Sequence, residues 1–383
     1  MREAVIVEGI RTPVGRRNGY FKDFRADDLA AEALKALINR AGMDPALVDD
    51  VIMGCVSQIG EQSGDIARVA ALIAGFPIEV PGTTIDRQCG SSQQAVHFAA
   101  QAILAGDMDV VIAGGVENMS RVPIGSSYQG VPFSEKLRSK YEIIHQGLSA
   151  ERIAEKYGFT RLELDRFSYE SHQKALKAQA NGYFKREIAP IEVTLPDGET
   201  ITVSEDAGPR EETSIEALGG LKTVFKEDGV IHAGNSSQIS DGAAALLIMS
   251  REKAEALGLK PRFRILTRTV VGSDPTLMLT GPIPATEKAL KKAGLTIHDI
   301  DVFEVNEAFA PVPLAWLKET GADHSKLNPN GGAIALGHPL GASGARLMVS
   351  MMHELERTGG RYGLQTMCEG HGMANATIIE RLD

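Results

Sequence analysis

The chain has 383 residues, of which 43% are hydrophobic, and a formal net charge of −10 at pH 7. This length allows two or three domains with full cores, and the hydrophobic fraction is typical of a soluble globular protein. The negative charge argues against general nucleic-acid binding, which needs a basic face. No apolar run is long enough to cross a bilayer, so we expect no membrane association.

The cysteine content and the absence of metal motifs narrow the class further. Three cysteines are too few for a disulfide framework, which favours a reducing compartment. The sequence has neither CxxC nor HExxH, so we expect no metal site. We also expect no bound cofactor. The first residues lack the pattern of a signal peptide, and the last lack a peroxisomal or retention tripeptide. We therefore expect a cytoplasmic protein.

Short apolar runs alternate with amphipathic helical patterns along the chain. The expected elements are strands at residues 4–7, 51–53 and 110–113, and helices at residues 29–41 and 95–105. This alternation predicts an α/β fold with a largely parallel sheet. For the helix at 95–105, we expect Ser91 or Ser92 to act as the N-cap and Gly106 to end the helix.

A repeat links the two halves of the chain. Residues 36–54 (ALINRAGMDPALVDDVIMG) are similar to residues 289–307 (ALKKAGLTIHDIDVFEVNE): each has a helix end, an Ala-Gly stop, an acidic turn and a buried strand. A looser second pair is an expected helix at 344–355 followed by a strand at 364–368, which matches the helix and strand after Cys89. Such a repeat predicts a ligand site where the two halves meet.

Residues 119–240 differ from both halves, because they are richer in charged and polar side chains. They have apolar periodicity of their own, with helix around 149–180 broken by Gly158, so we interpret them as an inserted domain. The expected division is an N-terminal half at 1–118 with 240–260, an inserted domain at 119–239, and a C-terminal half at 261–383. Residues 121–140 form an expected exposed excursion, suited to oligomerisation, to covering a ligand, or to neither.

Cys89 stands where an apolar segment gives way to a helix, in IDRQCGSSQQA at residues 85–95. Unpaired backbone N–H groups and the positive end of the helix dipole favour a thiolate at such a place, and the thiolate is the nucleophile. The residues after Cys89 are small, so a substrate backbone could approach closely. The alternative is a buried structural cysteine, which is commoner for a lone cysteine. Cys55, with no histidine or glycine turn near it, is interpreted as structural.

Two further segments carry polar groups suited to chemistry. Asn306 begins NEAFA, directly after an expected strand at 302–305, where it can orient a water or a carbonyl oxygen, or simply end the strand. His338 lies between a glycine and a proline in the glycine-rich run 330–344, an arrangement that suits a base or a hydrogen-bond donor. The run matches neither GxGxxG nor GxxxxGK[ST], which argues against nucleotide binding.

Two more segments complete the set. Cys368 ends an expected strand before a glycine turn in LQTMCEGHGM, where backbone N–H groups can form an oxyanion hole, although a hairpin cysteine is the alternative. The polar run at 233–239 leads into the small residues 240–245, which we expect to be helical. It can hydrogen-bond an amide-containing ligand or merely cap that helix.

Taken together, these segments resemble the thiolase family over the whole length of the chain. Five blocks occur in family order: the Cys89 segment, GGVENMSR at 114–121, NEAFA, GGAIALGHPLGASG and the C-terminal CxGxG. The resemblance implies an α/β fold with a five-layered α/β/α/β/α core, made of two repeated halves with an inserted loop domain. It also implies a homodimer, often a homotetramer built through the excursion at 121–140.

The resemblance further implies roles for five residues. Cys89 would accept the acyl group after activation by His338. Asn306, through a water, would join His338 in stabilising an enolate oxygen, and Cys368 would be the general acid/base. The backbone N–H groups of Cys89 and Gly370 would form a second oxyanion hole.

Other positions correspond to substrate contacts of the family. Ala233 and Ser237 would contact the pantetheine arm of coenzyme A, and Met278 and Phe309 would line the acyl end. Gln146 stands where the short-chain biosynthetic branch has methionine, which favours longer or bulkier acyl groups. Gln93-Gln94 resembles the corresponding pair in thiolases that act on unusual acyl groups, including steroid-derived acyl groups.

The activity implied by the resemblance is that of an acyltransferase, a 3-ketoacyl-CoA thiolase of the β-oxidation type. It would cleave 3-ketoacyl-CoA with CoA, through an acyl-cysteine, to acetyl-CoA and a shortened acyl-CoA. The alternatives are an acetoacetyl-CoA thiolase working in the condensing direction, a ketoacyl synthase, and an inactive CoA- or lipid-binding relative. Cys368 argues against the synthase. His371, where the family usually has glycine, leaves the inactive relative open because it could crowd the hole, contact substrate or point away.

Overall fold

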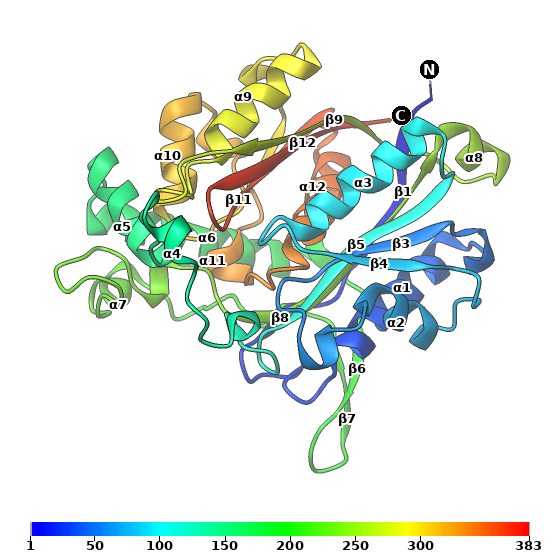
Figure 1. Ribbon diagram of the computed structural model, residues 1–383, viewed down its shortest axis with the longest axis horizontal. Coiled ribbons are helices and arrows are strands. Elements are labelled where there is room, and N and C mark those ends of the chain that lie inside the picture. Colours follow the sequence, from blue (N-terminus) through cyan, green and yellow to red (C-terminus); the bar gives the residue numbers. More distant parts are fainter. Residues whose placement is uncertain (1, 383) are drawn as a thin grey trace.

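The computed structural model describes residues 2–382 (Figure 1). Within them, a ten-stranded sheet has the order β10-β11-β12-β9-β1-β8-β5-β3-β4, with β2 beside β8, and β6 and β7 form a separate hairpin. The strands are β1 (Ala4–Arg11), β2 (Gly15–Arg16), β3 (Asp50–Gly54), β4 (Gly82–Ile85), β5 (Val110–Asn118), β6 (Ile191–Thr194), β7 (Thr200–Val203), β8 (Ser240–Ser250), β9 (Phe263–Gly272), β10 (Val302–Val305), β11 (Tyr362–Glu369) and β12 (Met373–Arg381).

The helices surround and divide this sheet. They are α1 (Ala26–Ala41), α2 (Ile66–Ile73), α3 (Ser91–Ala105), α4 (Glu135–Arg138), α5 (Gln146–Tyr157), α6 (Arg161–Ala180), α7 (Ile215–Gly219), α8 (Arg251–Ala256), α9 (Pro282–Ala293), α10 (Pro311–Thr320), α11 (Ala333–Leu336) and α12 (Ser343–Thr358). No helix in the described part of the chain has the length and apolar character needed to cross a membrane.

The packing of the helices on the sheet defines the layers of the fold. Helices α3 and α12 pack against each other between the two halves of the sheet, α3 on β3 and β5, and α12 on β10 and β11. Figure 1 shows α1 and α2 on one outer side and α9 and α10 on the other. Separate apolar clusters fill the two outer interfaces and the central one. The expected five-layered α/β/α/β/α core is confirmed.

The repeat expected from the sequence corresponds to matching elements. Gly42 ends α1 at φ 62°, and Gly294 ends α9 at φ 68°, so both stops use the left-handed conformation that glycine adopts readily. A short 3₁₀ turn then leads into β3 in one half and into β10 in the other. The strands that follow α3 and α12, β5 and β11, run parallel to β3 and β10 respectively.

The expectation of a largely parallel sheet was wrong. Among residues 2–382, only the pairs β3/β4, β3/β5 and β10/β11 of the large sheet are parallel, whereas the central strands pair antiparallel. A buried strand is apolar on both faces in either direction. The pattern of apolar runs therefore does not reveal which way a strand points.

The expected small-residue helix after the polar run at 233–239 was also wrong, because residues 240–250 form strand β8. This strand lies between β1 and β5, and helices α1, α3 and α12 pack against it. An added Cβ at Gly114 on β5 would overlap the backbone of Ala244. The alanines therefore serve close packing in the centre of the fold, which overrides their helix propensity.

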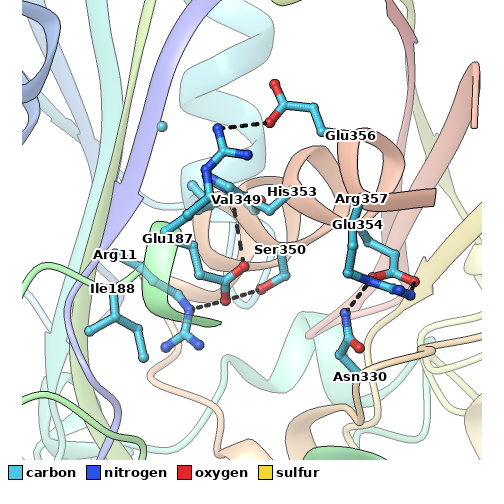
Figure 2. Close-up of polar contacts among 12 residues, drawn as sticks. Arg11, Glu187, Ile188, Asn330, Val349, Ser350, His353, Glu354, Glu356 and Arg357 are labelled. Carbon is cyan, nitrogen blue, oxygen red and sulfur yellow. Dashed lines mark hydrogen bonds and ion pairs between the residues drawn. The ribbon is translucent and has the colours of Figure 1, made fainter. Parts of the chain in front are cut away.

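The inserted region is tied to both halves. The helix expected at 149–180 is two helices, α5 and α6, separated at Gly158, which has φ 70°. Glu187, after α6, accepts hydrogen bonds from Arg11 Nε of β1 at 2.7 Å and from Ser350 Oγ of α12 at 3.0 Å (Figure 2). One buried carboxylate therefore joins the inserted region to the central helix.

Candidate active site

Cys89 lies in a tight turn immediately before α3, and its side chain is buried. Gly90 occupies the N-cap position and no side chain caps the helix, so the expected serine cap was wrong. The Ser91 hydroxyl accepts from the Arg87 N–H at 2.9 Å and donates to the Gln88 carbonyl at 2.6 Å. This serine therefore braces the turn that presents Cys89 instead of capping the helix.

The environment of Cys89 opposes ionisation. Burial raises the pKa of this thiol well above its ordinary value, and the nearby Cys368 and Glu369 raise it further. The expectation that the helix N-terminus favours a thiolate was therefore wrong for the resting protein. The helix dipole is weaker than the loss of hydration in a dry site that also contains acidic neighbours. Cys89 is a neutral thiol until a base removes its proton.

His338 lies in the loop between α11 and α12, and hydrogen bonds of its backbone and its ring fix its place. Its backbone N–H donates to the Gln238 carbonyl at 3.1 Å, and its ring nitrogens face Ser343 Oγ at 2.6 Å and Asn306 Nδ2 at 3.3 Å. The Ser343 hydroxyl donates its own proton to the Pro339 carbonyl at 2.7 Å, so it accepts from His338 Nδ1. The unprotonated Nε2 therefore carries the lone pair.

The charge state of His338 agrees with the chemistry of a base. Burial lowers its pKa to about 3, and the buried guanidinium of Arg346 acts in the same direction. The imidazole is therefore neutral at physiological pH, with its Nε2 lone pair available to accept a proton.

Asn306 follows β10 directly, and its backbone N–H donates to the Thr366 carbonyl of β11 at 3.1 Å. Its amide nitrogen faces His338, whereas its Oδ1 is buried without a hydrogen-bond partner within residues 2–382. A buried acceptor of this kind has strong affinity for a water or for a polar group of a ligand.

Cys368 lies near the end of β11, fully buried, and burial raises its pKa to about 12. The turn after it packs against the Cys89 segment. A Cβ added at Gly370 would lie 2.9 Å from Gln88 Oε1, and Asn375 Nδ2 donates to the Gly90 carbonyl at 3.0 Å. The segments that carry the two cysteines are therefore in direct contact.

The glycines after His338 pack its loop closely against β3, β5 and α3. A Cβ at Gly341 would lie 2.5 Å from the Val116 carbonyl, and one at Gly344 would overlap the backbone of α3. Cys89 shares an apolar cluster with Leu340 and Leu347, which flank this loop. The structure thus gathers the five residues assigned to catalysis from four separate segments: Cys89, Asn306, His338, Cys368 and Gly370.

The residues assigned to substrate contact lie beside this centre. Ala233 begins a 3₁₀ turn, and the Ser237 N–H that follows it donates to the Ala308 carbonyl at 3.0 Å. Met278 and Phe309 share one apolar cluster with Cys368. The assigned pantetheine end therefore adjoins the NEAFA segment through Ser237, and Phe309 of the same segment belongs to the assigned acyl end.

Gln146 precedes a glycine that packs on an aromatic ring near this region. It is the first residue of α5, and the next residue, Gly147, packs so closely on the Phe225 ring that a Cβ there would overlap it. Phe225 in turn contacts Phe309 edge-to-face, with 6.0 Å between ring centroids. The sequence analysis missed Phe225, because nothing in its local sequence distinguishes it.

Two further residues of the site, Ser343 and Glu369, lie within motifs that the sequence already singles out. Ser343 belongs to the glycine-rich run that contains His338. Glu369 lies between Cys368 and Gly370, fully inaccessible, and neither carboxyl oxygen has a hydrogen-bond partner within the described residues. Burial raises its pKa to about 8. Its carboxyl group packs against Gly90, where an added Cβ would overlap it.

His371 adopts a left-handed conformation with φ 66°. Its Nε2 lies 3.2 Å from the Tyr128 hydroxyl, and its ring meets that of Phe133 edge-to-face at 5.2 Å. The sequence left open whether His371 crowds the oxyanion hole, contacts substrate or points away. In the structure its side chain points toward Tyr128 and Phe133 of the excursion at residues 121–140.

Cys55 lies apart from the assigned catalytic residues, in the core of the N-terminal half. Cys55 follows β3, is buried in the N-terminal apolar cluster and has a raised pKa because of burial, as its structural interpretation requires. Within residues 2–382 no group of three or more His, Cys, Asp or Glu side chains could hold a metal ion.

Comparisons with known proteins agree with this fold. Models of the thiolase N-terminal and C-terminal domains match residues 4–252 and 259–381. The chain is 51% identical to the steroid 3-ketoacyl-CoA thiolase FadA6 of Mycobacterium tuberculosis, covering 100% of this chain and 95% of that protein. It is 46% identical to the 3-oxoadipyl-CoA/3-oxo-5,6-dehydrosuberyl-CoA thiolase of Escherichia coli, covering 100% of both.

The fold is also similar to that of a solved structure. The crystal structure of the Bacillus anthracis acetyl-CoA acetyltransferase superimposes with a TM-score of 0.93 at 41% identity, covering 100% of this chain and 99% of that one. The chain belongs to the thiolase family.

Proposed function

We propose that this protein is a degradative 3-ketoacyl-CoA thiolase. It is an acyltransferase that cleaves 3-ketoacyl-CoA with CoA into acetyl-CoA and a shortened acyl-CoA. The observation that carries the proposal is the convergence of two buried thiols, Cys89 and Cys368, with a neutral histidine whose tautomer leaves Nε2 unprotonated. Such a set offers a nucleophile, a base and a second proton carrier in one dry site.

The first step forms the acyl-enzyme. Cys89 gives its proton to His338 as its sulfur attacks the C3 carbonyl of the substrate. The C2–C3 bond then breaks, which leaves the shortened acyl group on the sulfur. Cysteine suits this step because it attacks as a soft nucleophile and later leaves as a thiolate. The Cys89 and Gly370 backbone N–H groups stabilise the oxyanion at C3.

Bond cleavage releases an enolate of acetyl-CoA. The Asn306 side chain, through a water held by its unpartnered Oδ1, and His338, now protonated, stabilise the enolate oxygen. Cys368 then protonates the enolate carbon and becomes a thiolate, so acetyl-CoA departs. In the second half, the Cys368 thiolate takes the proton of incoming CoA. The CoA sulfur attacks the acyl-Cys89 carbonyl, and the Cys89 sulfur leaves and recovers its proton from His338.

We propose substrates larger than acetoacetyl-CoA. The two curated relatives are named for steroid-derived and dicarboxylic 3-ketoacyl-CoA substrates, and Gln146 replaces the methionine of the short-chain biosynthetic branch. Ala233 and Ser237 hold the pantetheine arm, and Met278 and Phe309 line the acyl end. Coenzyme A is the second substrate in this proposal, with no other cofactor.

We also propose a homodimer or homotetramer in the cytoplasm. Strand β4 is an edge of the large sheet, and neighbouring apolar side chains such as Leu72, Ile73 and Ile78 are exposed. An open edge beside exposed apolar groups favours pairing with a second copy. All three cysteines are free, as in a reducing compartment. We retain the division into halves at 1–118 with 240–260 and at 261–383, around an insert at 119–239.

Intact-protein mass spectrometry after mixing with acyl-CoA tests the mechanism. We expect a single acyl adduct that maps to Cys89 and disappears when CoA is added. Turnover with Cys89 never modified would overturn the proposal. Cleavage rates for acetoacetyl-CoA and for 3-ketoacyl-CoAs of increasing size test the substrate range. A preference for acetoacetyl-CoA would favour the biosynthetic alternative.

A further inference from the structure

His371 holds a conformation that its residue type disfavours. Its φ of 66° lies in the left-handed region, and the following residue, Gly372, has φ 78°. A glycine at position 371 would adopt this conformation without strain, whereas any residue with a Cβ adopts it at a cost in free energy that side-chain contacts can offset. The compensating contacts are the Tyr128 hydroxyl at 3.2 Å and the Phe133 ring at 5.2 Å.

These contacts are the main attachment of the loop at residues 123–134, here called the excursion loop. Its other hydrogen bonds are local ones, to residues between 118 and 138. Within residues 2–382, His371 is the only partner outside the 119–145 segment to which a side chain of this loop makes a hydrogen bond or ring contact. The loop is otherwise exposed, with Ile124 56% and Val131 70% accessible.

The turn that bears His371 also touches the rest of the site. Gly370 precedes it, and its N–H belongs to the proposed oxyanion hole. On the other side, the Ser273 N–H donates to the Gly372 carbonyl at 2.7 Å, and the segment from Ser273 leads to Met278 at the proposed acyl end. One side chain therefore connects the excursion loop to both the reaction centre and the acyl site.

We propose that His371 is a positioning residue that clamps the excursion loop onto the Cys368–Gly370 turn, so that the loop is ordered beside the proposed site. The inference rests on the proposed function for its effect on substrate, but not for the clamp itself. Loss of the clamp frees the loop, and the KM for bulky 3-ketoacyl-CoAs rises more than kcat falls.

The test uses His371→Asn in the full-length protein, because asparagine tolerates the left-handed conformation but lacks the ring. Exposed basic residues just after the loop, Lys136, Arg138 and Lys140, report its mobility through limited trypsin cleavage. We expect cleavage there to become about tenfold faster, as loss of one hydrogen bond and one ring contact predicts. Cleavage at the wild-type rate would overturn the clamp, whether or not the protein has thiolase activity.

A double-mutant cycle separates the clamp from a general loosening. Tyr128→Phe removes only the hydroxyl, and we expect a smaller increase in trypsin cleavage than for His371→Asn. The combined variant should cleave no faster than His371→Asn alone, because the hydroxyl has already lost its partner. Additive effects would contradict a direct clamp. If thiolysis is active but the KM for bulky substrates is unchanged in His371→Asn, the role in substrate positioning fails and the proposed function stands.

Discussion

Ser343 Oγ lies 2.6 Å from Nδ1 of His338 and donates its own proton to the Pro339 carbonyl. One serine therefore decides which imidazole nitrogen carries the proton. This relationship connects the first turn of α12 to the base that we assign to Cys89. It also explains why the loop around His338 must be rigid, because a turned ring would present the protonated nitrogen to the substrate.

Ser343→Ala should therefore lower kcat for thiolysis about 10- to 100-fold, because the buried Nδ1–H loses its acceptor and the ring loses its fixed tautomer. Ser350→Ala is the matched control, since Ser350 is a buried serine of the same helix that donates to Glu187 at 3.0 Å (Figure 2). We expect that control to lose stability while keeping its kcat. Equal kcat values for the two variants would show that Ser343 does not orient the base.

The second thiol has a separate prediction. Cys368→Ala should lower kcat by about 10²- to 10⁴-fold, because the enolate and the incoming CoA lose their proton carrier. Cys55→Ala is the matched control, another buried cysteine at a strand end. Its variant should lose stability only slightly and keep its activity. Steady-state thiolysis and thermal unfolding of both variants distinguish these results, and a fully active Cys368→Ala would exclude the assigned role.

Glu369 predicts a pH dependence of stability. Burial raises its pKa from the ordinary value of 4.5 to about 8, so the folded protein holds a proton that the unfolded chain releases between these values. Stability contributed by this group is complete below about pH 4.5 and is lost as the pH rises toward 8. Glu369→Gln should flatten that decline in the free energy of unfolding, by on the order of a few kcal/mol at pH 8.

Two comparisons sharpen the measurement. The pKa of Glu304 is also raised to about 8, so part of the wild-type decline should remain in Glu369→Gln. Glu380 has a lowered pKa because Arg361 and Arg264 donate to it, so Glu380→Gln should instead destabilise the protein at neutral pH. Denaturant titrations at pH 5, 6.5 and 8 give all three results. An unchanged slope in Glu369→Gln would show that this carboxyl ionises freely in the folded state.

The contact between Gly90 and Glu369 predicts that a substitution at one residue can offset the effect of a substitution at the other. An added Cβ at Gly90 would overlap the carboxyl group, so Gly90→Ala should destabilise the protein by about 1–3 kcal/mol and disturb Cys89. Truncating the carboxylate in Gly90→Ala/Glu369→Ala should recover part of that loss. Denaturant unfolding of the two single variants and the double variant checks this. A strictly additive double variant would mean that the clash is with the rest of the β11–β12 hairpin.

The sequence predicts the helix ends, the repeat and the family of this protein, because the patterns that indicate them are local. The two Ala-Gly helix stops, at Gly42 and Gly294, require the left-handed conformation, and the acidic turns and buried strands after them make the repeat visible. The break at Gly158 was readable for the same reason. The blocks around Cys89, His338 and Cys368 identify the family without any knowledge of their contacts.

The tertiary structure decided whatever depends on neighbours distant in sequence. Strand direction and the β8 strand were mispredicted because burial between layers, not local propensity, determines them. The protonation state of Cys89 was mispredicted because only folding buries its thiol and brings it close to Glu369. The sequence names the groups that can react, because motif chemistry is local. Only packing decides their charge and tautomer, because both depend on which distant groups exclude water and which accept hydrogen bonds.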